Sequence, residues 1–160
     1  MAIETIVAAL ATVYRETFDR AAGGLWIKRI TETVPEAVNE WPSLYFIADA
    51  GEVTGLTLPS ACDAAVGTGT VHRRGLQVVH RFKGQLLVQP RRNLQQADTA
   101  ARPFVQAMIH VTEENYRLGR TVLGVQVVSY DYGVLTFGQV EQRAVEYIGC
   151  EFVYEAREVI

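Results

Sequence analysis

The spacing of apolar residues along the chain predicts two amphipathic helices. Residues 3–18 carry apolar side chains at intervals of three and four, which is the period of one helix face. This helix should stop at Gly23 and Gly24, because paired glycines suit a left-handed helix cap. A second helix should begin at Pro103, a residue type favoured at the first helical position, and should end within residues 115–119. Its apolar stripe comprises Phe104, Val105, Met108, Ile109 and Val111.

Other apolar runs have the lengths and alternation of β-strands. Residues 27–35 are rich in β-branched side chains and predict a strand with one solvated face. The short run at 44–47 is typical of a strand covered on both faces. The clearest alternation covers residues 76–89, with Leu76, Val78, His80, Phe82, Leu86 and Val88 on one side. Further strand material lies at 122–128, 130–137 and 148–155.

Residues 51–71 show no regular period and contain several glycines. Structureless connections of this length are uncommon inside compact domains, and they are usually functional or disordered. We therefore predict a long loop or arm that orders against a neighbouring subunit. The candidate contact residues of the arm are Val53, Leu56, Leu58, Pro59 and Val66.

Taken together, the predicted elements form one α+β domain over residues 1–160. Two helices would pack on one face of a mainly antiparallel sheet of about four to six strands, with the arm at about 51–71. Two helices can cover only one face of such a sheet. We therefore expect part of the other face to be solvated or to pack on another subunit.

Composition narrows the class of protein further. A chain that is 49% hydrophobic and 21% charged has the composition of a folded domain rather than a disordered one. No window approaches about 18 uninterrupted apolar residues, so we expect no membrane span. The N-terminal residues lack the basic region and cleavage site of a signal peptide, which favours the cytoplasm. Cys62 and Cys150 lack CxxC spacing, so we expect a reducing compartment.

We find no sequence motif that predicts a metal site or a nucleophile. His72, His80 and His110 fall in different elements and lack the spacing of metal ligands. Both His80 and His110 are interpreted as hydrogen-bonded core residues. Cys62 lies beside Asp63, but no base is identifiable for it.

Motifs for cofactor binding and paired-acid catalysis are also missing from the sequence. Gly67 and Gly69 open a dinucleotide-like pattern whose third glycine position holds His72. Glu113 and Glu114 are adjacent on the second predicted helix, so their carboxylates point in different directions. We therefore expect no cofactor, and a structural protein rather than an enzyme.

Charge is distributed unevenly along the chain. The net charge of −3 argues against a protein dominated by phosphate contacts. No acidic residue occurs between Asp63 and Asp98, and this interval holds a basic set, Arg73, Arg74, Arg81, Lys83, Arg91 and Arg92. The C-terminal region holds an acidic set, Glu141, Glu146, Glu151 and Glu155.

The basic set permits three interpretations. It can be the solvated edge of the long strand at 76–89. It can meet the acidic set of an adjacent copy in a head-to-tail ring, where complementary charge fixes register. It can also face nucleic acid, although few aromatic residues alternate with the basic ones and Phe82 is predicted to point inward.

The order of elements resembles the tail-terminator proteins of tailed bacteriophages over most of the chain. The resemblance is carried by the first helix, the two strands that follow it, the long strand, the second helix and the closing strands. These parts are residues 3–18, 34–35, 41–46, 77–89, the helix after Pro103, 123–127 and 147–154.

The resemblance implies a ring, typically a hexamer, on the head-proximal end of the tail tube in the virion. Such a ring halts tube polymerisation after assembly in the host cytoplasm. Its partners would be further copies of the chain, the tail tube protein and a head-completion or neck protein. Genomic DNA would pass through the channel without sequence-specific binding, and no membrane would be involved. The alternatives are a nucleic-acid-binding module that uses residues 73–92, or another head–tail connector protein.

Overall fold

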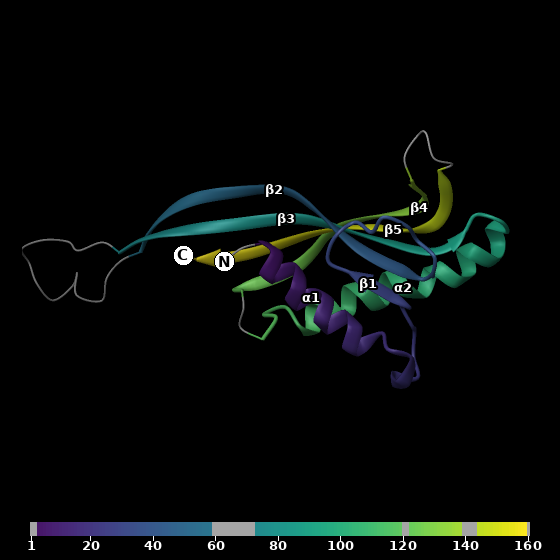
Figure 1. Cartoon of the computed structure of the whole chain (residues 1–160). Helices are drawn as coiled ribbons and strands as arrows, with labels where there is room; N and C mark the ends of the chain where they lie inside the picture. Colours follow the sequence, from purple (N-terminus) through teal and green to yellow (C-terminus); the bar gives the residue numbers. More distant parts are fainter. Residues whose placement is uncertain (1–2, 59–72, 120–121, 139–143, 160) are drawn as a thin grey trace, which may run out of the picture.

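Two helices lie on one face of a five-stranded sheet in the computed structural model of the chain (Figure 1). The structure describes residues 3–58, 73–119, 122–138 and 144–159. This arrangement confirms the predicted α+β fold with a mainly antiparallel sheet. The elements are α1 (Ile3–Thr17), β1 (Arg29–Thr31), β2 (Ser43–Leu58), β3 (Arg73–Pro90), α2 (Leu94–Glu114), β4 (Gly124–Phe137) and β5 (Val145–Val159).

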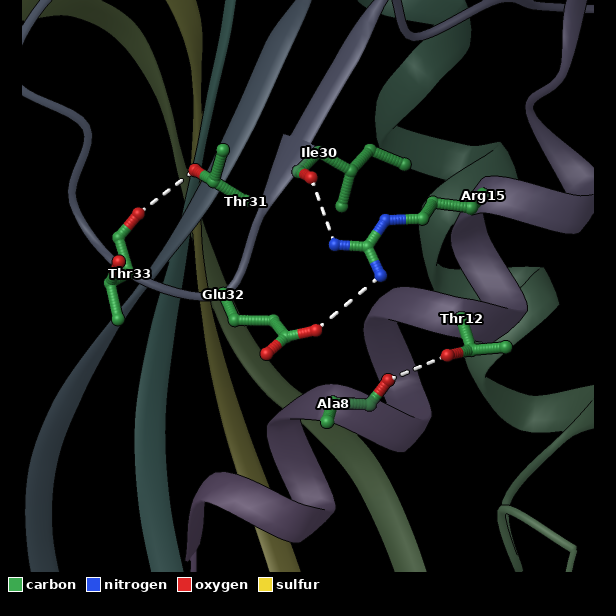
Figure 2. Close-up of polar contacts among 7 residues, drawn as sticks. All are labelled: Ala8, Thr12, Arg15, Ile30, Thr31, Glu32 and Thr33. Atoms are coloured by element: carbon green, nitrogen blue, oxygen red, sulfur yellow. Dashed lines mark hydrogen bonds and ion pairs between the residues drawn. The ribbon is translucent and has the colours of Figure 1, made fainter.

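The sheet has the strand order β1-β2-β3-β5-β4. Strand β1 is parallel to β2, and the other three pairs of neighbours are antiparallel. The strand predicted at 27–35 is shorter in the structure, because β1 covers only Arg29–Thr31. The Thr31 hydroxyl donates to the carbonyl of Thr33 (2.8 Å), and Arg15 of α1 donates to the carbonyl of Ile30 (3.0 Å), as Figure 2 shows. These contacts end β1 and turn the chain away from the sheet.

Helix α1 presents its apolar stripe to the sheet, as its spacing predicts. Ile6, Leu10 and Tyr14 are fully buried against it. The helix ends at Thr17, and a 3-10 turn at Arg20–Ala22 then leads to Gly23. Gly23 has a left-handed φ of 75°, so the predicted glycine stop is present one short turn after the α-helix.

Helix α2 begins at Leu94, and the prediction that it begins at Pro103 was wrong. Its first turn is capped by Asn93, whose side chain accepts a hydrogen bond from the Gln96 backbone N–H (3.3 Å). An internal proline costs a helix about 3 kcal/mol. Ala97 and Ala101 precede Pro103 in the helix and are buried, and alanine is the best helix former, so both favour the longer helix. Neither helix is long and apolar enough to cross a membrane.

A buried hydroxyl cluster joins the two helices to the sheet. The Tyr14 hydroxyl of α1 is hydrogen-bonded to Thr112 of α2 (2.5 Å) and to the Tyr154 hydroxyl of β5 (3.0 Å). The Tyr154 ring stacks on Phe82 of β3 with centroids 5.1 Å apart. Burial raises the pKa of Tyr14 to about 12, so the phenol stays neutral and keeps its hydrogen bonds at physiological pH. These contacts position both helices over the middle of the sheet.

Two glycines allow the close contacts of this core. Gly84 lies under the Tyr154 ring, and a Cβ atom there would lie 2.9 Å from it. Gly149 lies opposite the irregular pairing between Leu87 and Gln89, where a Cβ atom would be 1.8 Å from the Leu86 carbonyl oxygen. The second contact is with backbone, which cannot move aside as a flexible side chain can.

The structure refines the predicted arm. Residues 51–58 continue β2 and pair with the first half of β3, and the two strands form a hairpin that extends beyond the helices (Figure 1). Val53 lies in this extension and is exposed. The side chains of Leu56 and Leu58, and the whole of Pro59 and Val66, lie outside the described residues.

Replacing Gly149 with alanine should destabilise the fold severely. The added methyl group would overlap the Leu86 carbonyl oxygen, and overpacking of this kind costs about 3 kcal/mol. Gly24→Ala is the matched control, because a Cβ atom at Gly24 has no neighbour within 4 Å, and we expect a change within ~0.5 kcal/mol. Urea unfolding followed by circular dichroism measures both. Equal midpoints for the two variants would contradict the close approach.

Candidate functional site: a charged sheet face and two open sheet edges

The sheet face that the helices do not cover carries the centre of both predicted charge sets. Arg81 of β3 is the registered partner of Glu155 on β5, with Nε and Oε2 3.4 Å apart. Lys83 of β3 lies 3.8 Å from Glu151 of β5. The basic and acidic candidates are therefore cross-strand neighbours in one chain, not separate surfaces.

Glu155 is the most constrained carboxylate of this face. It is only 8% exposed, and Arg157 donates to it from Nη2 (2.8 Å) and Nε (3.1 Å). The hydrogen bonds from Arg157, together with Arg81, hold the pKa of Glu155 below its usual range. The residue is a charged structural anchor between β3 and β5.

A polar chain continues from Glu151 to β2. Gln85 donates to Glu151 (2.5 Å), and the Tyr45 hydroxyl donates to the Gln85 side-chain oxygen. Burial and the nearby negative charge of Glu151 raise the pKa of Tyr45 to about 12. The face opposite the helices is therefore cross-linked over three strands by polar side chains, and Tyr45 also packs there in a second buried apolar cluster with Leu87 and Tyr147.

The remaining members of the charge sets lie elsewhere. Arg91 pairs with Glu146 (2.9 Å) at the end of β3, and both side chains are well exposed. Arg92 is exposed in the turn after β3. The side chains of Arg73 and Arg74, and the whole of Glu141, lie outside the described residues.

These positions change the interpretation of the charge pattern. The prediction that the two sets meet across a subunit boundary finds no support at the three described pairs, since each acid already binds a basic partner in its own chain. Local neutralisation also weakens the nucleic-acid interpretation, because phosphate binding depends on unneutralised basic charge.

The histidine predictions are partly correct. His80 is largely buried and hydrogen-bonded to Glu158 (2.9 Å). His110 is not a core residue, because its side chain is 67% exposed and pairs with Glu114 one turn away (3.2 Å). Cys150 is buried, and burial raises the pKa of its thiol to about 12, which leaves it unreactive. Within the described ranges, no group of three or more His, Cys, Asp or Glu side chains could hold a metal ion.

The structure shows which edges of the sheet are open. Among the described residues no strand pairs with the outer side of β4, or with the outer side of β2 beyond Tyr45. Strand β4 carries the exposed apolar residues Val128, Tyr130 and Val134. A signal was present in the sequence, because residues 124–137 contain one charged residue, Asp131, and no proline.

An apolar groove of about 350 Å³ accompanies the open edge of β2. It lies between α1, the turn after β1 and β2, where the chain leaves the sheet. Figure 2 shows the contact of Arg15 with Glu32 and that of Thr31 with Thr33, which hold this turn. The lining residues are Ile3, Glu4, Val7, Glu32, Thr33, Val34, Phe46, Ile47 and Ala48.

Removing Arg157 should destabilise the protein in a pH-dependent manner. Because the pKa of Glu155 is lowered in the fold, its pair with Arg157 stabilises the protein above the unfolded pKa and loses its effect as the pH falls through the folded pKa. We expect Arg157→Ala to cost about 1–2 kcal/mol at pH 7, and much less at pH 3. Urea unfolding at both pH values measures the difference.

Arg91→Ala is the matched control for this prediction. Its ion pair with Glu146 is equally short but exposed on both sides, so its loss should cost less than ~1 kcal/mol. A cost for Arg157→Ala that is unchanged at low pH, or no larger than that of the control, would show that the pair contributes packing rather than charge.

Comparison with models of known protein families and with curated proteins finds no match to this chain. A proposal for its function therefore rests on the order of its elements and on the surfaces that the helices leave uncovered.

Proposed function

We propose that the chain is a structural subunit of a phage virion that forms a ring on the head-proximal end of the tail tube and joins it to the neck. The observation that carries the proposal is a sheet with two open edges: among the described residues, no strand pairs with the outer side of β4 or with the outer side of β2 beyond Tyr45. Unpaired strand edges promote uncontrolled association unless they are covered, and ring closure covers them. The element order, which resembles the tail terminators, supports the same function.

The two ends of the sheet suit the axial partners of such a ring. At one end the β2–β3 hairpin extends beyond the helices (Figure 1). At the other end Trp26 and Trp41, each more than a third exposed, line a cleft of about 330 Å³ with Lys28, Asn39 and Glu40. Exposed tryptophans are enriched among the residues that dominate binding between proteins. One end would face the tail tube and the other the neck protein.

The charged sheet face fits this function better than nucleic-acid binding. Its basic residues Arg81, Lys83 and Arg157 are paired with Glu155 or Glu151 within the chain, so their attraction for phosphate is reduced. In the proposed ring, DNA passes through a channel and has to slide freely. A polar, locally neutral surface satisfies that requirement without strong binding.

The proposed function predicts a closed oligomer that binds tube ends. Native mass spectrometry of the purified chain should give one dominant assembly of several copies, hexameric if the resemblance holds. Added to tail tubes polymerised from the tube protein of the same genome, it should appear at one end only in electron micrographs. It should also stop elongation, so the tubes become shorter than tubes grown without it.

Two results would argue against this function. A chain that stays monomeric at every concentration, including with tubes, removes the ring. An oligomer that does not bind tube ends, but binds DNA with an affinity that falls steeply as the salt concentration rises, favours the nucleic-acid alternative. In that case Arg73→Glu combined with Arg74→Glu should weaken the binding.

A further inference from the structure

We propose that β4 of one copy adds to the outer edge of β2 in the next copy, with Tyr130 and Val134 entering the apolar groove beside that edge. The inference rests on the proposed ring and names the contact between its subunits. In strand addition of this kind, main-chain hydrogen bonds give affinity and pockets for alternate side chains give specificity. The structure provides both features at opposite edges of one sheet: the unpaired edge of β4 at one, and the apolar groove beside β2 at the other.

The groove exists because β1 is short. Strand β1 pairs with β2 only as far as Tyr45, and the chain then turns away at Glu32 and Thr33. In the part of the chain that the structure describes, no strand therefore lies next to Phe46 and Ala48, and α1 forms the far wall of the groove. A strand from another copy would occupy the position beside β2 that follows the end of β1.

The exposed residues of β4 lie on the matching face of the sheet. Tyr130 is registered with Phe152, and Val134 with Ile148, two residues buried in the main core under the helices. The Tyr130 and Val134 side chains are nevertheless 54% and 44% exposed. The helices thus leave Tyr130 and Val134 exposed at the β4 edge, on either side of Tyr132, whose hydroxyl donates to Asp98 of α2.

The same ladder relates β4 to the groove. Phe152 is registered with Gly84 of β3, which in turn is registered with Phe46 of β2. Tyr130 and Phe46 therefore share one face of the sheet. Placing β4 beside β2 of the next copy, with the sheet continuous, directs Tyr130 and Val134 to the side on which the groove opens.

Strand direction also fits. Three antiparallel steps separate β2 from β4 within one chain, so the two strands run in opposite directions. A head-to-tail contact between them is then an ordinary antiparallel pair. The pairing of β2 is irregular after Ala48, and that of β4 is irregular at Val127–Ser129. These irregularities confine the contact between copies to the regular stretches of the two strands.

The groove rim favours tyrosine as the inserted residue. Glu4 and Glu32 contribute carboxylates to a lining that is otherwise mainly apolar. A phenol can place its ring against Val7 and Phe46 and donate its hydroxyl to a rim carboxylate. Strand β4 offers such a residue in Tyr130 and carries no basic residue.

Cross-linking between copies tests the contact directly. Val34, at the groove, and Val134, on β4, are replaced by cysteine in separate Cys62→Ser chains, in which the buried Cys150 is retained. A short bifunctional maleimide should join the two variants only when they are mixed. The double variant should give a ladder of bands that ends at the copy number of the ring. Cross-linking of Val134→Cys to itself would instead indicate β4 pairing with β4, and it would overturn the proposal, as would no product in the mixture.

A second measurement uses side chains of matched type and exposure. Tyr130→Lys should raise the concentration needed for assembly at least about tenfold, since it places a charge in an apolar groove. Tyr116→Lys is the control, because Tyr116 is 47% exposed but lies outside β4. Both variants should keep the circular dichroism spectrum of the parent. Unchanged assembly of Tyr130→Lys would overturn the proposal.

These readouts separate the contact from the proposed function. A ring that cross-links as expected but does not bind tube ends supports the contact and removes the tail function. An oligomer that caps tubes without the Val34 to Val134 cross-link keeps the function and removes the contact.

Discussion

The structure depends on how two helices are held over the middle of a five-stranded sheet. The Tyr14 hydroxyl binds Thr112 and Tyr154, and this ties α1 and α2 to β5 at one buried point. Aromatic rings of β2, β3 and β5 pack around that point, with Phe82 stacked on Tyr154. A buried hydroxyl without a partner would cost about 1–3 kcal/mol, so the cluster favours one placement of the helices. That placement covers Val125 and Tyr132 of β4 but leaves Tyr130 and Val134 exposed at its edge.

The sequence predicts those features that depend on local pattern. Periodicity places α1, the buried strand at Leu44–Ile47 and the long alternation of β3, because each follows from which side chains face the core. Periodicity gives a wrong boundary where two local preferences compete, as at the start of α2. Pro103 is a typical helix start, yet burial of Ala97 and Ala101 extends α2 two turns before it. Alanine contributes little to an apolar stripe, which is why this extension was missed.

The candidate surfaces could be predicted less well, since they depend on which strands become neighbours. Arg81 and Glu155 are distant in sequence, and only the pairing of β3 with β5 brings them together. A charge pattern read along the chain does not show that these two residues are neighbours in the sheet. The groove beside β2 depends on a turn of a few residues after Thr31, and such a turn leaves no periodic pattern in the sequence from which it could be predicted.

In the proposed ring, a copy of the same chain covers each open edge of the sheet. An unrelated strand could cover one edge, but the other would remain, whereas copies joined head to tail cover both at every contact. Such a series closes into a ring only if the rotation per copy divides a full turn, and otherwise it grows as a fibre. Sheet twist supplies a rotation of fixed hand, and the interruptions in β2 and β4 prevent the sheet from extending as a flat ribbon. In the proposed ring, the irregular edges would therefore favour closure, and covering the open edges would make assembly part of the stability of the fold.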